Sequence, residues 1–150
     1  MAVKRLDNVA IVVADLDAAI AFFAEVGLTL EARAEIEGPW ADRVVGLEAI
    51  RSEIAMMATP DGKSRLELTA YRTPGPVTPE PAQPPSNSLG MHRLMFNVDD
   101  VNDTFARLEP HGATLIGDIV DYEGIYRLCY LRGPSGIIVA LAEDLAPDLA

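Results

Sequence analysis

Several features that mark other classes of protein are missing from this sequence. It holds one cysteine, so no disulfide can form within the chain and a reducing compartment is indicated. That residue, Cys129, lies inside an apolar segment, which predicts an inert thiol. No apolar run reaches the ~20 residues of a membrane span, and the first residues lack the apolar stretch of a signal peptide. These absences predict a cytoplasmic protein with no membrane partner.

Positive charge is also scarce. The chain has 12 Lys and Arg against 23 Asp and Glu, which gives a formal net charge of −11. A nucleic-acid partner is therefore not expected, because binding a phosphate backbone requires clustered cations. The acidic balance is compatible with a cationic ligand, although solubility alone explains it as well.

What the sequence does contain is an internal repeat. Its 150 residues fit one compact domain, and the composition is that of an ordinary globular protein. A shift of 85 residues aligns segment 8–30 with segment 93–115 without a gap, and 6 of the 23 aligned positions are identical. Self-similarity of this kind predicts two copies of one structural module.

Each copy has the same order of local signals. An alternating apolar run predicts a half-buried strand over 9–13 and over 94–98. Asp15 and Asp100 then stand at the N-cap of a helix. Gly27 and Gly112 stand where a left-handed residue ends that helix. A further strand is expected after each glycine.

The end of each copy predicts a hairpin. Strands are expected over 54–59 and 65–71 around Pro60-Asp61-Gly62, and over 128–132 and 137–143 around Pro134-Ser135-Gly136. The predicted fold class is α+β, a single domain over 1–150. It consists of two tandem βαβββ modules, at residues 1–71 and 91–145.

Two segments fall outside the repeat. Residues 72–90 contain six prolines, which predicts an extended, exposed linker rather than a strand. Residues 38–46, which include Trp40, have no counterpart in the second copy. They predict an extra loop or helical turn that either covers a pocket or only connects two strands.

Side-chain alternation along the strands selects the candidate site residues. Apolar residues such as Ile11, Leu68 and Phe96 must cover the helices, so their neighbours in sequence point to the opposite face. Four residues at equivalent places on that face are expected around one concave surface: Asn8, Glu67, Arg93 and Ala140. The other candidates for binding a substrate are Trp40, Thr69, Tyr71, Met95, Asn97 and Tyr126. Tyr130 is a further aromatic residue that could line a ligand pocket.

Four segments carry a resemblance to a known family. They are residues 6–17 (LDNVAIVVADLD), 65–68 (RLEL), 94–101 (LMFNVDDV) and 133–141 (GPSGIIVAL). Together they resemble the vicinal-oxygen-chelate superfamily, which includes glyoxalases, bleomycin resistance proteins and dioxygenases. The resemblance covers nearly the whole chain apart from the linker and the last residues. It implies that the two modules form an eight-stranded cup, commonly completed in a homodimer.

The resemblance also implies a degenerate metal site. Many members bind a divalent ion through His, Glu, His and Glu, and these positions hold Asn8, Glu67, Arg93 and Ala140 in this sequence. Ala140 offers no ligand and Arg93 is a permanent cation, so no metal or other cofactor is expected. His92 would restore a ligand only if its strand slipped by one residue. Glu143 could replace the glutamate missing at Ala140, but it lies three residues further on and has the alternation of the core positions.

The hypothesis favoured by these residues is an enzyme of the isomerase, lyase or cyclase type. It acts without a metal on a small oxygenated metabolite, with Glu67 as the base and Arg93 as its electrostatic partner. Two alternatives stay open. One is a protein that sequesters a bulky, often cationic drug, as bleomycin resistance proteins do. The other is a metal-dependent lyase or dioxygenase, which the lost ligands disfavour.

Overall fold

The protein's structure, a computed structural model, describes residues 3–90 and 93–146. It has the predicted α+β class, with α-helices and two separate β-sheets. The chain divides into two compact units, residues 1–78 and 79–150. The division falls inside the proline-rich segment. No helix among the described residues is long and apolar enough to cross a membrane.

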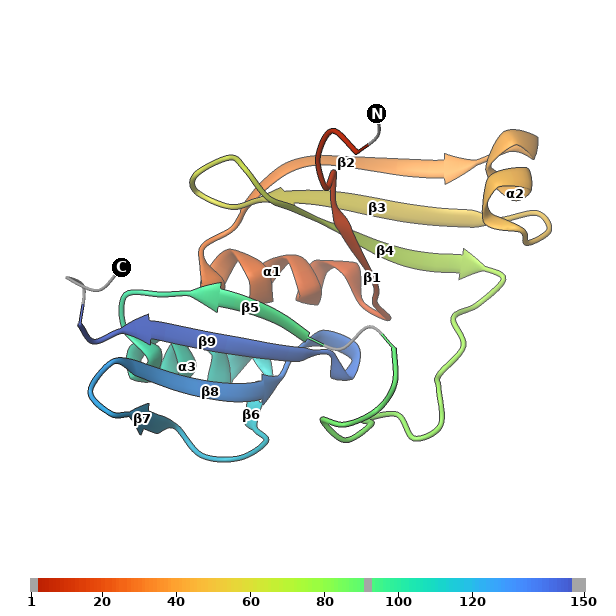
Figure 1. Ribbon diagram of the computed structural model, residues 1–150. Coiled ribbons are helices and arrows are strands. Elements are labelled where there is room, and N and C mark those ends of the chain that lie inside the picture. The colour runs from red at the N-terminus through yellow and green to blue at the C-terminus, as the bar shows by residue number, and fades with distance from the viewer. Residues whose placement is uncertain (1–2, 91–92, 147–150) are drawn as a thin grey trace. The chain divides into compact units, whose positions relative to one another are not determined.

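Unit 1 is a four-stranded sheet with one long helix (Figure 1). Its elements are β1 (Val9–Val12), α1 (Leu16–Val26), β2 (Thr29–Glu37), α2 (Pro39–Val45), β3 (Arg51–Ala58) and β4 (Arg65–Thr73). The strand order is β1-β4-β3-β2, with β1 parallel to β4 and the other pairs antiparallel. The first strand of the unit therefore pairs with the last.

Helix α1 lies against β2, β3 and β4 and builds the core of unit 1. The Asp15 carboxylate accepts the N–H of Ala18 at 3.0 Å, which caps the first turn as predicted. Gly27 ends the helix at a φ of 127°. The fully buried Phe23, Met57 and Leu68 show which face of the sheet the helix covers.

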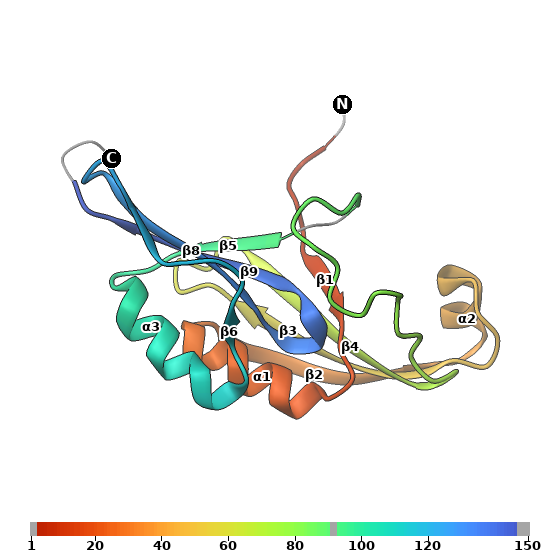
Figure 2. The ribbon, with the colours of Figure 1, turned by 90° about the horizontal axis from the view of Figure 1, so that it is seen from below.

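Unit 2 repeats this arrangement with a second sheet, and α3 packs on one of its faces (Figure 2). Its elements are β5 (Arg93–Asn97), α3 (Val101–Leu108), η1 (Glu109–His111), β6 (Thr114–Leu115), β7 (Val120–Tyr122), β8 (Tyr126–Arg132), η2 (Pro134–Gly136) and β9 (Ile138–Asp144). The order is β5-β9-β8-β6, and β7 also pairs with β8. β5 is parallel to β9, as β1 is to β4.

The predicted repeat is confirmed, since β1 and β5, α1 and α3, and β2 and β6 all correspond at the shift of 85 residues. Asp100 caps α3 by accepting the N–H of Asp103, as Asp15 caps α1. Among the strands, the copies differ most at the outer neighbour of the central hairpin. The partner of β3 is the nine-residue β2, whereas the partner of β8 is broken into β6 and β7 (Figure 1).

The structure also corrects several expected bounds. β3 begins at Arg51, three residues before the prediction, and β4 continues to Thr73. Residues 39–45 form the helix α2 at the end of β2, so the helical alternative is the right one (Figure 1). The turn at Pro134-Ser135-Gly136 holds Ser135 in the left-handed region, at a φ of 55°. No strand occurs over 74–90, as predicted for the linker.

Candidate functional site

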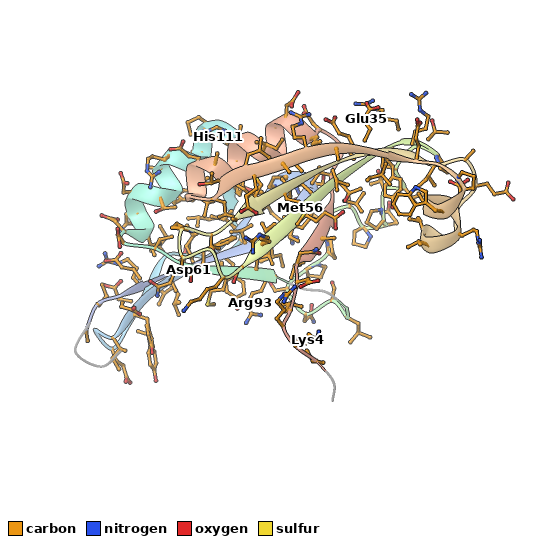
Figure 3. All side chains as sticks on the ribbon, turned by 90° about the horizontal axis from the view of Figure 1, so that it is seen from above. Lys4, Glu35, Met56, Asp61, Arg93 and His111 are labelled. Atoms are coloured by element: carbon orange, nitrogen blue, oxygen red, sulfur yellow. The ribbon has the colours of Figure 1, made fainter. Side chains whose placement is uncertain are left out.

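The predicted alternation along β4 is confirmed by the strand register. Glu67 lies beside Ala10 on β1 and beside Met56 on β3 (Met56 is labelled in Figure 3). Leu66 and Leu68 are buried on the helix-covered face, so Glu67 points to the opposite face. Its side chain is half-buried among apolar neighbours. A carboxylate thus stands between two apolar neighbours on the sheet face opposite α1.

The cations of unit 1 leave this carboxylate without a partner. Arg33 and Arg72 both bind Glu53, at 2.8 Å and 3.1 Å, on the face that α1 covers. Arg65 binds Glu31 at 2.7 Å where β2 is bulged. Within residues 3–78 the Glu67 carboxylate makes no hydrogen bond or ion pair. Its charge is therefore available to a group from outside the unit.

The other candidates of unit 1 fall into two places. Thr69 and Tyr71 follow Glu67 on the same face of β4; Thr69 is 8% exposed and Tyr71 is half-buried. Asn8 is half-buried just before β1. Trp40 lies on α2 and is 61% exposed. Glu67, Thr69 and Tyr71 form one row, to which Trp40 does not belong.

In unit 2 the equivalent row is neutral. Met95, Ala140 and Tyr130 lie side by side on β5, β9 and β8, as Ala10, Glu67 and Met56 do in unit 1. Ala140 is fully buried there. Asn97 donates to the Asp144 carboxylate at 3.2 Å, and Tyr126 lies opposite Asp144. The candidates Met95, Asn97 and Tyr126 are all exposed.

Arg93 opens β5 with its side chain on this same face (Arg93 is labelled in Figure 3). Its guanidinium carbon lies 5.1 Å from the centroid of the Tyr130 ring, a cation–π contact. Among the described residues of unit 2 it has no carboxylate partner. The guanidinium thus contacts an aromatic ring, and no hydrogen bond from its N–H groups to the other described residues of unit 2 is present.

Tyr130 also lines a cavity of about 320 Å³ that lies wholly within unit 2. The other lining residues are Ser86 of the linker, Val120, Leu128, Cys129 and residues 116–118. The volume is at the lower end of the range for small-molecule pockets. None of the ten candidate site residues lines it. Tyr130 was expected as a possible pocket wall, but the position of this cavity was not predicted.

Cys129 reaches this cavity from a buried position. The residue is 3% exposed, and burial raises the pKa of its thiol. A raised thiol pKa leaves little thiolate near neutral pH, which agrees with the predicted inert cysteine.

No group of three or more His, Cys, Asp or Glu side chains able to hold a metal ion occurs among residues 3–90 and 93–146. The carboxylate of Glu143 accepts the N–H of Val101 at 2.9 Å at the start of α3. It therefore lies on the helix face and does not replace the ligand lost at Ala140. His92 lies outside the described residues.

Comparison with known proteins identifies the family. The profile of the Glyoxalase/Bleomycin resistance protein/Dioxygenase superfamily matches residues 5–141. The chain belongs to this superfamily. A glyoxalase family protein of Bacillus cereus is 51% identical, with a TM-score of 0.92 over 97% of each chain. The curated protein YaeR of Escherichia coli is 25% identical over 148 residues, which covers 96% of this chain and 99% of YaeR.

Another solved structure with a similar fold is that of TnmS3, an antibiotic binding protein from Streptomyces sp. CB03234. It is 22% identical, with a TM-score of 0.58, and covers 96% of this chain and 98% of TnmS3. At this identity the likeness shows the fold alone. Of the four positions at which the resemblance places the superfamily's metal ligands, Asn8 and Glu67 belong to unit 1 and Arg93 and Ala140 belong to unit 2.

Proposed function

We propose that this protein acts on a small oxygenated organic molecule without the divalent ion that many members of its superfamily use. The observation that carries the proposal is the residue set at the ligand positions. A methyl group at Ala140 and a guanidinium at Arg93 stand where a carboxylate and an imidazole would be needed. Two oxygen ligands, from Asn8 and Glu67, are too few to hold such an ion beside a fixed positive charge.

Glu67 is the proposed base. Its half-buried carboxylate binds no cation among residues 3–78, so it can accept a proton from a substrate carbon next to a carbonyl group. The electron pair left by that proton moves onto the carbonyl oxygen and forms an enolate. The Arg93 guanidinium then donates hydrogen bonds to that oxygen, and the proton returns from Glu67 to the product. The pairing of Glu67 with Arg93 joins residues of the two units and stays a prediction.

Proton exchange with solvent tests this mechanism directly. The purified protein is treated with a chelator, checked for residual metal by mass spectrometry, and incubated in D2O with small hydroxyketones and 2-oxo acids. Proton NMR then measures the loss of the signal of the exchanging carbon. We expect exchange in the metal-free protein and its loss in Glu67→Gln, which keeps the shape of the side chain but removes the base.

Two results would contradict the proposal. One is a stoichiometric divalent ion that restores activity after chelation, which would revive a metal-dependent lyase or dioxygenase. The other is exchange that survives both Glu67→Gln and Arg93→Gln. The predicted homodimer is tested on the same sample by light scattering.

A ligand-sequestering protein is the second candidate, favoured by the cavity of unit 2. That cavity has mainly apolar walls and an inert thiol, and no catalytic group proposed above lines it. The known relative TnmS3 is described as an antibiotic binding protein. Tight binding without proton exchange or other turnover would favour this function over the enzyme.

A further inference from the structure

The cavity of unit 2 exists because the strand beside β8 is interrupted. β6 ends at Leu115 and the N–H of Ile116 still donates to the carbonyl oxygen of Tyr130, so residues 117–119 leave the sheet before β7 begins at Val120. Leu128 and Tyr130 of β8 line the cavity beside this irregular segment. The hollow that results has an apolar floor and is open to solvent at its rim.

The linker supplies the remaining wall of the cavity through Ser86, and two contacts fix it there. Arg132 donates one guanidinium N–H to the carbonyl oxygen of Pro84 at 2.5 Å and another to that of Gly136 at 3.0 Å. At Gly136 the turn comes so close that an added Cβ would stand 2.8 Å from the carbonyl oxygen of Ala82. The cavity is thus a built feature of unit 2, since its wall is held by a part-buried arginine.

One charged group lines this cavity, and a second contacts one of its lining residues. The Arg93 guanidinium is stacked on Tyr130, a lining residue. Asp118 lines the rim, is exposed, and follows Gly117 in the irregular segment between β6 and β7. Arg93 is on a strand and is oriented by an aromatic ring, so its N–H donors are better preorganised than the Asp118 carboxylate.

We propose that this cavity binds the ring of an aromatic carboxylate and that Arg93 binds the carboxylate group. This inference shares one assumption with the proposed function, namely that Arg93 binds an oxygen atom of the ligand. A guanidinium presents parallel donors to a carboxylate, and an apolar hollow of this size removes a small ring from water. The ligand class is therefore a small organic acid rather than the bulky cation that the net charge of −11 allows.

A matched set of three probes separates these ligand classes. They are 2-naphthoate, the neutral 2-naphthamide and the cationic 2-naphthylmethylamine, which share one ring system. Binding is measured by calorimetry, and NMR chemical shifts of the labelled protein locate each probe. We expect 2-naphthoate to bind most tightly, with shifts at residues 116–120 and 128–130.

Three variants test the assignment of residues. Arg93→Gln should weaken 2-naphthoate about tenfold, since a hydrogen bond to a charged group contributes this much. The same variant should leave 2-naphthamide unchanged. Val120→Trp, which fills the hollow from an exposed position on β7, should abolish binding. Tyr122→Trp on the same strand does not line the cavity and should bind normally.

The inference is overturned if the amine binds more tightly than the acid and Asp118→Asn removes its binding, because the ligand is then a cation. It is also overturned if Arg93→Gln binds 2-naphthoate as the wild type does, or if no 2-naphthoate binds at its solubility limit. The proposed function fails separately. Binding of 2-naphthoate by the wild type, together with proton exchange that Glu67→Gln removes, supports both proposals. Binding of 2-naphthoate by a wild type that shows no proton exchange removes only the enzyme.

Discussion

Replacing Gly136 by alanine perturbs the contact between the linker and the turn before β9, and Gly62 provides a matched control. Both glycines end a Pro-X-Gly turn between two strands, and both have a left-handed φ, 82° at Gly136 and 72° at Gly62. They differ in their surroundings. A Cβ at Gly62 would meet nothing within 4 Å, whereas a Cβ at Gly136 would stand 2.8 Å from a linker carbonyl oxygen. The difference between the two variants therefore isolates the linker contact.

The expected magnitudes follow from these surroundings. An alanine in the left-handed region costs about 1 kcal/mol, and this applies at both positions. At Gly136 the linker must also move, which weakens the hydrogen bond from Arg132 to Pro84. A bond from a charged donor contributes about 1.5 kcal/mol. Gly136→Ala should therefore lower the free energy of unfolding by about 2.5 kcal/mol, against about 1 kcal/mol for Gly62→Ala.

Urea denaturation of the full chain measures both values, and hydrogen exchange of the 80–90 segment reports the linker itself. Exchange there should accelerate in Gly136→Ala and stay at the wild-type rate in Gly62→Ala. Equal destabilisation by the two substitutions, with unchanged exchange in the linker, would refute the reasoning. The linker would then not be held by this contact.

Three further results are expected. Glu143→Ala should lower the free energy of unfolding in urea by about 1 kcal/mol, because the N–H of Val101 loses its acceptor at the start of α3. Cys129 should react slowly with a thiol reagent at neutral pH, and its raised pKa should cost stability as the pH rises above 9.0, a loss that Cys129→Ala removes. The hydrogen bond from Arg127 lowers the pKa of Asp121 below 3.8, so the stability from this pair should be present above that pH and fall as the pH drops through the lower value. Asp121→Asn should abolish this acid-dependent part of the urea midpoint, and an unchanged pH profile would contradict the assignment.

The parts of the fold that the sequence predicts are those that local chemistry determines. The caps at Asp15 and Asp100 need only residues within one turn of the helix, and both are present. Strand alternation identified the face of Glu67 and of Met95, because one face of each sheet must cover a helix. The helix caps and the strand alternation occur in both copies, so each copy supports the prediction made for the other.

The parts that were missed depend on contacts between distant segments. The contact of Arg132 with Pro84 spans the unit, and no local pattern marks either residue as its partner. The break between β6 and β7 was also missed, since Thr114 and Leu115 match the first copy and predict a continuing strand. Because the cavity requires both features, its position could not be predicted from alternation alone.

The parallel pairing of the first and last strand in each unit has a consequence for synthesis of the chain. β1 finds its neighbour only when β4 has been made, and β5 must likewise wait for β9. Pairings of this kind join residues far apart in sequence and form slowly. Each unit is therefore expected to fold as a whole after its final strand leaves the ribosome. A chain cut within a module would lack the partner of its opening strand, whereas one ending between residues 73 and 79 would hold a complete first unit.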